Sequence, residues 1–199
     1  MEAMIAIAVL SSVTIVALNT ITNAADTESL NKDYMSALML IDSGAQEVLG
    51  LYKNNLEKFG VPNEAACGLN IALTATTFSD CNPNSATQSL YNSSYIVYLD
   101  PADQIIKATQ TVGGTFTEEN ITNDYLVYEA PIGNGDFLLT QNAGIDPLSK
   151  PTRYFRKLNV NNTPNGTSTD VAINIQVAFQ KKGGKYSIQE KTINLTLGE

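Results

Sequence analysis

Two side-chain types that carry much of enzyme chemistry are missing from this sequence of 199 residues. It contains no histidine and no tryptophan. Without histidine, the chain has no imidazole-based acid–base catalysis, no Ser-His-Asp triad and few ways to build a zinc or copper site. The composition therefore predicts a protein that is not an enzyme and that carries no cofactor.

The two cysteines, Cys67 and Cys81, bracket a loop rich in small and polar residues. They form neither a CxxC redox pair nor half of a four-ligand metal site. We predict a disulfide between them, which would place this part of the chain in an oxidising compartment and stabilise it by about 3 kcal/mol. Two buried free thiols are the alternative.

Loop aspartates are the remaining residues that could bind a metal ion. They are Asp100, Asp103, Asp136 and Asp146. Oxygen ligands on loops suffice for calcium, but the spacing is not that of an EF-hand, and solvated turn residues are the favoured interpretation. The sequence predicts no metal site and offers no candidate for a catalytic residue.

Charge and composition restrict the partners. The net charge is −8, and the basic residues form only two short groups, at residues 153–157 and 181–185. Phosphate binding needs clustered Lys and Arg, so we expect no constitutive nucleic-acid partner. The apolar content of 43% is enough for a core, and a charged content of 16% fits an extracellular β-rich domain.

The N-terminal segment is apolar from Ala3 to Ala25, without a charged residue. This length is enough to cross a bilayer. A secretory signal peptide would place Lys or Arg before the apolar run, although Asn23 and the two alanines after it resemble a cleavage site. A plain membrane anchor does not explain Glu2, because a carboxylate near hydrocarbon is costly unless it has a partner. We therefore expect Glu2 to be paired with a cation.

Residues 26–60 continue the apolar pattern with a different period. Apolar residues recur at intervals of three and four, which predicts one apolar face of a helix: Leu30, Tyr34, Ala37/Leu38, Ile41, Ala45, Val48/Leu49, Tyr52, Leu56 and Phe59. The opposite face is predicted to carry Lys32, Asp33, Asp42, Glu47, Lys53 and Lys58. Gly60 and Pro62 form a stop signal. The predicted helix is about 90 Å long, with a protruding apolar half and an amphipathic half that packs on the rest of the chain.

The run from Met1 to Leu10 resembles the N-terminal segment of type IV pilins and type II secretion pseudopilins. In that family a Phe-Thr-Leu-Ile-Glu type motif leads into an apolar helix, and Glu2 matches the family's early glutamate. The leader peptide, its glycine cleavage site and the first mature residues of the family are absent, so the segment begins late relative to the family pattern. The residues Arg153-Tyr154-Phe155-Arg156 and the terminal hairpin are also similar to the C-terminal pattern of minor pilins.

The resemblance implies that Glu2 pairs with the N-terminal amine of a neighbouring subunit and guides docking. It implies that residues 1–25 act as a transmembrane helix before assembly and as a filament-core helix afterwards. The core-forming side chains would be Ala3, Met4, Ile5, Ile7, Val9, Leu10, Val13, Ile15, Val16 and Leu18. Residues 61–92, which hold both cysteines, correspond to the connecting loop of the family.

The expected function is that of a structural subunit of a type IV pilus, a filament serving adhesion, motility or DNA uptake. Its partners would be other pilin subunits, the inner membrane before assembly and the pilus assembly machinery, and its final location would be the cell surface. A pseudopilin of a type II secretion system is one alternative. A membrane-tethered extracellular binding module that acts as a monomer, with a dispensable Glu2, is the other.

Pilins in filaments often unwind part of the helix behind the apolar tip. This chain has no Pro or Gly there, but Thr14, Asn19, Thr20, Thr22 and Asn23 have low helix propensity. Local melting across residues 12–23 in a filament is therefore a hypothesis, with an unbroken helix as the alternative.

Residues 93–199 read as a β-rich head. Strand-like runs occur at residues 95–99, 104–109, 125–129, 136–140, 152–158, 171–179 and 186–197. Alternation is clearest from Val171 to Phe179, and the Gly183-Gly184 pair predicts a hairpin before the last run. The predicted fold class is α+β, with a long N-terminal α-helix and an antiparallel sheet in the order of a β-meander, as in type IV pilins.

Overall fold

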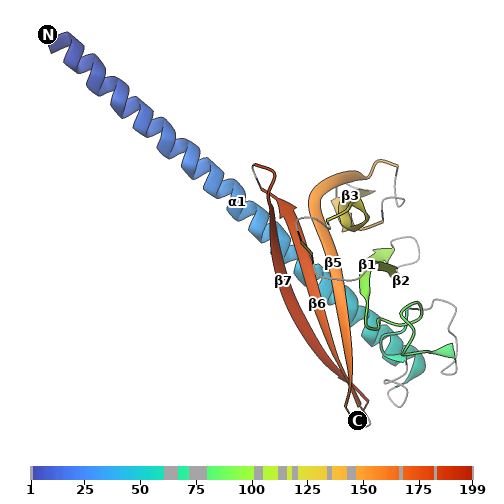
Figure 1. The fold of residues 1–199 in the computed structure, drawn as a ribbon. Helices are drawn as coiled ribbons and strands as arrows, with labels where there is room; N and C mark the ends of the chain where they lie inside the picture. Colours follow the sequence, from blue (N-terminus) through green and yellow to red (C-terminus); the bar gives the residue numbers. More distant parts are fainter. Residues whose placement is uncertain are drawn as a thin grey trace. The chain divides into compact units, whose positions relative to one another are not determined.

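The computed structural model describes residues 2–60, 67–71, 80–100, 105–111, 116–117, 121–133, 136–142, 147–165, 168–181 and 183–198. In the helix, side chains are described from residue 14 onward. The chain forms two units, Met1–Ser36 and Ala37–Glu199. Figure 1 shows the elements coloured along the sequence.

The predicted long helix is confirmed as α1, which runs from Glu2 to Phe59. It ends where the stop signal was predicted. Gly60 has a φ of 82°, a left-handed conformation that glycine adopts without steric strain. The Gly60 amide donates to the Leu56 carbonyl at 2.9 Å, which satisfies one of the last carbonyls of the helix.

All seven predicted strand regions form strands of one antiparallel sheet, so the α+β class is confirmed. The strands are β1 (Ser94–Asp100), β2 (Ile105–Thr111), β3 (Leu126–Gly133), β4 (Asp136–Thr140), β5 (Lys150–Asn165), β6 (Ser168–Gln180) and β7 (Tyr186–Leu197). A short 3-10 helix, Asn123–Tyr125, precedes β3.

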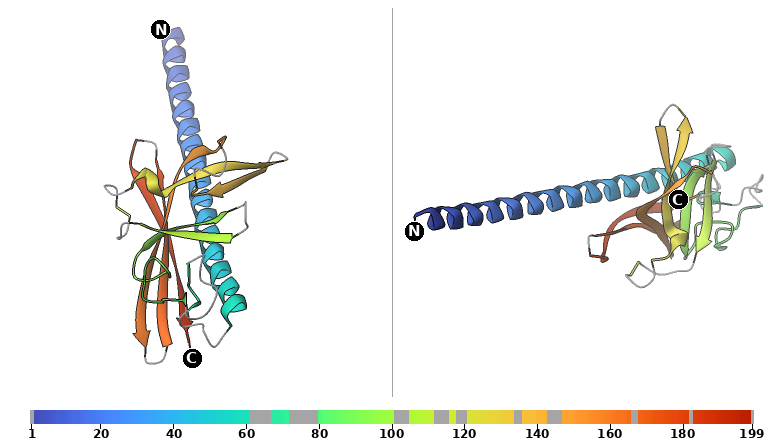
Figure 2. Two further views of the ribbon diagram at one scale, coloured as in Figure 1. Left: turned by 90° about the vertical axis from the view of Figure 1, so that its right-hand side faces the viewer. Right: turned by 90° about the horizontal axis from the view of Figure 1, so that it is seen from above.

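The prediction of a simple meander is wrong, because the described strands show no pairing of β2 with β3 or of β4 with β5. The β1–β2 and β3–β4 hairpins both pair with β5. The two hairpins pair with different parts of the same edge of β5. Strand β3 pairs with residues 150–155, and β1 pairs with residues 158–159. Periodicity identifies strands but not their partners, and a β5 of 16 residues is long enough for both hairpins. Figure 2 shows the hairpins and the long β5–β7 ribbon.

One face of the sheet packs on the Ala37–Phe59 part of α1. The alternation predicted from Val171 to Phe179 is confirmed, since every second side chain there is at most 1% exposed. Leu158 and Val160 of β5 pair with Ile175 and Ile173 and extend the same face. At Gly44 a Cβ atom would lie 3.2 Å from Ile175 Cγ2, so the absence of a side chain permits the close approach of helix and sheet.

The buried face of this part of α1 is narrower than predicted. Ala37, Ile41 and Val48 are buried as expected. Leu38 and Leu49, which the pattern also placed on the apolar face, are 47% and 43% exposed. Each helical residue turns the side chain by 100°, so of two adjacent apolar residues only one points at the sheet, and the pattern alone does not say which.

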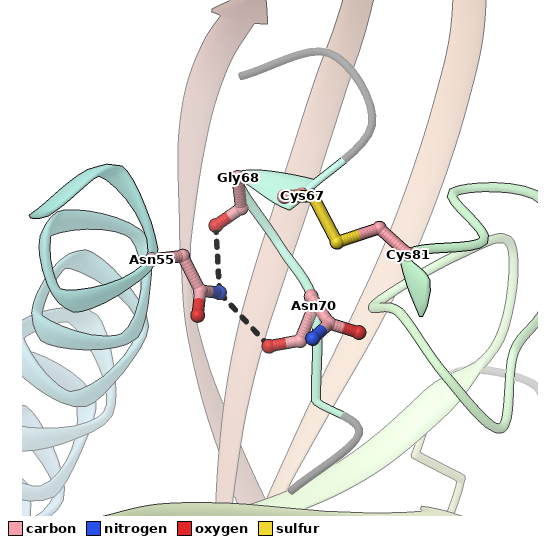
Figure 3. Close-up of a disulfide and its surroundings, with 5 residues drawn as sticks. All are labelled: Asn55, Cys67, Gly68, Asn70 and Cys81. Atoms are coloured by element: carbon pink, nitrogen blue, oxygen red, sulfur yellow. Dashed lines mark hydrogen bonds between the residues drawn. A yellow bond between two sulfur atoms is a disulfide. The ribbon is translucent and has the colours of Figure 1, made fainter. Parts of the chain in front are cut away.

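The disulfide between Cys67 and Cys81 is confirmed, and a helix side chain anchors the segment beside it (Figure 3). Asn55 is 8% exposed, and its Nδ2 atom donates to the carbonyls of Gly68 at 3.1 Å and Asn70 at 2.8 Å. Because both carbonyls are held by one side chain, the amide fixes the cysteine-bearing segment to the end of α1.

The two hydrogen bonds of Asn55 can be tested by comparing a substitution of Asn55 with one of its exposed neighbour. We predict that Asn55→Ala lowers the free energy of unfolding by about 1–3 kcal/mol, because two carbonyls lose their buried donor. The exposed neighbour Asn54 is the control, and Asn54→Ala should change the free energy of unfolding by less than about 0.5 kcal/mol. Chemical denaturation followed by circular dichroism measures both, and equal effects of the two substitutions would contradict the assignment.

Candidate functional site

The predicted docking residue, Glu2, is the first residue of α1, and its side chain lies outside the described part of the structure. The same holds for a group of predicted core-forming side chains, whose backbone is helical: Ala3, Met4, Ile5, Ile7, Val9, Leu10 and Val13. The transmembrane and filament-core roles of residues 1–25 stay predictions.

The remaining predicted core-forming side chains are described and exposed. Ile15 is 59%, Val16 64% and Leu18 58% exposed. Ile21, which the sequence analysis did not include, is 63% exposed. In the described residues, no helix combines the length and the apolarity needed to span a membrane.

The helix is unbroken across residues 12–23 in this chain. Thr20 and Thr22 donate their hydroxyl hydrogens to the carbonyls of Val16 at 2.9 Å and Leu18 at 2.8 Å. These bonds satisfy the two hydroxyls within the helix. The hydroxyls are then not bonded to backbone groups in a way that would favour a non-helical conformation. Melting of this segment within a filament stays a hypothesis.

A second exposed apolar group lies on α1 within the unit Ala37–Glu199. Leu38, Met39 and Leu49 are 47%, 66% and 43% exposed. The helical repeat places these three side chains on one side of α1, away from the buried Gly44 and Val48. We call Leu38, Met39 and Leu49 the outer helix patch.

Arg156 of β5 is a buried polar residue of this unit, 1% exposed. Its Nη2 atom donates to Glu47 Oε2 at 2.7 Å and to the Val97 carbonyl at 2.6 Å. Nε donates to Gln141 Oε1 at 3.2 Å. Nη1 lies 3.4 Å from the Leu40 carbonyl and 3.5 Å from Ser43 Oγ. Each of the five guanidinium N–H groups thus faces an acceptor.

Arg156 occupies the point where the two hairpins divide β5. We call this point, between the parts of β5 that pair with β3 and with β1, the fork. The side chain of Gln141 lies at the fork, where its Nε2 atom donates to the carbonyls of Arg156 at 2.6 Å and Tyr125 at 3.0 Å. Arg156 therefore joins α1, β1 and β5 in one polar cluster.

The sequence analysis placed Glu47 on the solvent face of the helix, and this prediction is wrong. Its side chain is 12% exposed and faces Arg156. Burial raises the pKa of the Glu47 carboxyl above its ordinary value of 4.5, and the neighbouring guanidinium offsets only part of that effect. The missed signal was a Glu three residues after Gly44, where the absence of a side chain leaves room for Arg156, whose Cδ atom would lie 3.5 Å from an added Cβ.

Lys157, the next residue of the predicted basic group, is also 1% exposed. It lies on the opposite face of β5 from Arg156, with its Nζ atom 4.8 Å from the ring centre of Tyr125 and 5.4 Å from that of Phe116. Two of the three basic residues at 153–157 thus belong to the interior, which removes them from any surface for anionic partners.

The unit also contains a pocket of about 390 Å³. One wall comes from the segments around Leu69 and Leu90, and the other from the ends of β5, β6 and β7. Sequence reasoning did not find it, because its walls meet only when the strand ends converge on the segment that follows the disulfide. Among the described residues, no group of three His, Cys, Asp or Glu side chains could hold a metal ion.

No protein-family model matches this chain, and no significant match is found to curated proteins or solved structures.

The Arg156 cluster is testable by removing one charge and then both. We predict that Arg156→Met lowers the free energy of unfolding by about 3–5 kcal/mol, because it leaves Glu47 buried without its cation. Adding Glu47→Leu should restore part of that loss, since the uncompensated charge is then gone. The control is Arg153→Met at an exposed position of the same strand, with an expected change below about 0.5 kcal/mol. Urea denaturation measures these three variants and the single Glu47→Leu variant. A double variant whose loss equals the sum of the losses of Arg156→Met and Glu47→Leu would contradict the pairing.

The raised pKa of Glu47 predicts how its contribution depends on pH. The folded protein holds the Glu47 proton more tightly than the unfolded chain, so the resulting stabilisation is complete below the ordinary pKa of 4.5. It is lost as the pH rises through the raised value. We therefore expect the unfolding free energy of the wild type, minus that of Glu47→Gln, to fall from acidic to neutral pH. A difference that grows with pH would show that Arg156 outweighs burial.

Proposed function

We propose that this chain is a structural subunit of a type IV pilus, which polymerises through its apolar N-terminal helix into an extracellular filament. The observation that carries the proposal is the exposure of large apolar side chains near the start of α1. Ile15, Val16, Leu18 and Ile21 are each more than half exposed.

Exposed apolar surface of this kind needs a partner. Burying it stabilises an assembly by about 25 cal/mol for each Å² removed from water. A helix packed against copies of itself buries this surface along its length, and a lipid bilayer does so before assembly. When two copies meet through different surfaces and their rotation does not close a ring, repeated addition of subunits gives an open helical polymer.

The outer helix patch supports the same proposal from the other unit. Leu38, Met39 and Leu49 share one side of α1, on the face that is not used to pack on the sheet. The same side also carries the exposed Asp42, Gln46 and Lys53, so the patch is a mixed surface in which apolar and polar side chains alternate. Under the proposal, the patch contacts the α1 helices of neighbouring subunits.

Glu2 has the docking role in this proposal. A carboxylate at the start of an apolar helix is stabilised within a bundle of such helices when a specific cation neutralises it. The N-terminal amine of a neighbouring subunit supplies that cation, and the pair sets the position at which each new subunit stops.

We predict that Glu2→Ala abolishes or strongly depletes filaments, because loss of one partner of a buried ion pair costs about 3–5 kcal/mol at every docking contact. The measurement is electron microscopy of filaments sheared from cells, with this chain detected in each sheared fraction. Glu28, an exposed carboxylate of the same helix, is the matched control, and Glu28→Ala should leave filament yield unchanged.

The outcomes separate the alternatives. Abundant wild-type filaments that contain this chain and disappear with Glu2→Ala support a pilus subunit with a docking glutamate. Absence of filaments from every variant, with the protein retained in the membrane, would contradict the proposal and favour the tethered binding module. Short filaments in place of long ones would favour a secretion pseudopilin.

A further inference from the structure

Lys157 of β5 is a buried lysine that takes no part in the polar cluster around Arg156. It is 1% exposed, and its ammonium lies 4.8 Å from the ring centre of Tyr125 and 5.4 Å from that of Phe116. Among the described residues, no carboxylate forms an ion pair with it. A lysine amine in apolar surroundings is one of the side-chain nucleophiles that proteins use to form covalent bonds.

The side chain directly across the sheet from this lysine is a glutamine amide. Lys157 and Gln176 of β6 are partners in the β5–β6 register, and Gln176 is 3% exposed. Directly opposed residues of antiparallel strands lie on the same face, with Cβ atoms about 4.5–5.5 Å apart. A lysine side chain is long enough to cover that distance. The two side chains also share a neighbour, because the Phe116 amide donates to Gln176 Oε1 at 3.0 Å.

The amide of Gln176 has a hydrogen-bonding pattern that favours attack on its carbonyl carbon. Oε1 accepts a second hydrogen bond, from Asn159 Nδ2 at 3.0 Å. Two donors on one carbonyl oxygen stabilise the oxyanion that forms when a nucleophile adds to the carbon. At the other end of the amide, Nε2 donates to Glu190 Oε2 at 2.9 Å. Glu190 is exposed, so its carboxylate connects the amide nitrogen to water.

We propose that Lys157 and Gln176 form an intramolecular isopeptide bond, with Glu190 as the proton carrier. The bond from Nζ to Cδ forms, the bond from Cδ to Nε2 breaks, and the nitrogen of Gln176 leaves as ammonia. The lysine ammonium gives up two protons in this exchange. Glu190 carries one of them to Nε2, and the released ammonia takes up the other to become ammonium. The reaction needs no oxidant, reductant or other reactant.

The bond joins β5 and β6 covalently, one residue after the arginine that binds the sheet to α1. Every residue involved lies in the unit Ala37–Glu199, and the reaction takes place within one chain. The inference therefore goes beyond the proposed function and does not rest on it. A tethered monomer would form the same bond as a filament subunit.

The test is peptide mass spectrometry of the full chain, which is first folded in detergent micelles and then denatured, reduced and digested with trypsin. Without the isopeptide bond, trypsin cleaves after Lys157 and releases the peptide 158–181 at its sequence mass. With the bond, cleavage after Lys157 is blocked. The peptide 157–181 then appears with the loss of one ammonia, about 17 Da. We expect this second result for the wild type.

The digest separates the isopeptide bond from another source of the same mass loss. Asn165 precedes a glycine in the same peptide, and cyclisation of that asparagine also releases ammonia. That reaction leaves Lys157 cleavable, so only the isopeptide bond combines the mass loss with a blocked cleavage. Recovery of the peptide 158–181 from the folded wild type, without the linked peptide, would overturn the proposal. A link from Lys157 to Asn159 in the fragment spectra, in place of Gln176, would overturn it as well.

Glu190→Gln separates the chemistry from folding, because the substitution is at an exposed position. After refolding from urea, this variant should form the bond about a hundredfold more slowly than the wild type, since the proton carrier is lost. The matched control is Glu129→Gln, which removes an exposed carboxylate of β3 outside the cluster and should form the bond at the wild-type rate. Equal rates in Glu190→Gln and the wild type would overturn the role of Glu190.

Discussion

The desolvation of one guanidinium constrains the architecture of the sheet-bearing unit. Arg156 is buried at the point where the β1–β2 and β3–β4 hairpins divide β5. An arginine taken out of water is tolerated only where its N–H groups all meet acceptors. Those acceptors come from Glu47 of α1, Val97 of β1 and Gln141, so the helix, the first hairpin and the segment after β4 are bound to one residue.

This constraint also explains why the sheet has a fork. The edge of β5 that faces the hairpins has no strand partner between residues 155 and 158. In place of a partner strand, the Gln141 side chain donates a hydrogen bond to the Arg156 carbonyl. The Arg156 side chain donates to the Val97 carbonyl of β1. Two side chains thus replace ladder bonds that a continuous strand would have made, and they pair the carbonyls of Tyr125, Arg156 and Val97.

The sequence predicted local features well and long-range ones poorly, for a physical reason. The extent of α1, the glycine that ends it, the seven strands and the disulfide all depend on neighbouring residues, whose periodicity and turn chemistry are visible in the chain. The pairing of β1 and β3 with β5 depends on contacts between distant segments. Glu47 was misplaced for the same reason, since its burial is set by an arginine far away in the sequence.

The candidate sites differ in the same way. The apolar residues near the N-terminus form a continuous run that the sequence shows directly, while the exposure of Ile15, Val16 and Leu18 is seen only in the structure. The pocket is different, because Ser89, Asn162 and Leu197 are distant in the sequence and meet only when strand ends converge on the segment after the disulfide. No local pattern marks such residues, since each is an ordinary loop or strand-end residue by itself.

The two candidate sites have opposite chemical requirements, which argues for separate roles. The exposed side chains of α1 are large and apolar, and they gain by contact with any apolar surface, including copies of the same helix. The walls of the pocket are uncharged, with both apolar and hydrogen-bonding side chains among the described residues. The exposed side chains of α1 and the uncharged pocket are therefore chemically distinct surfaces of the same chain.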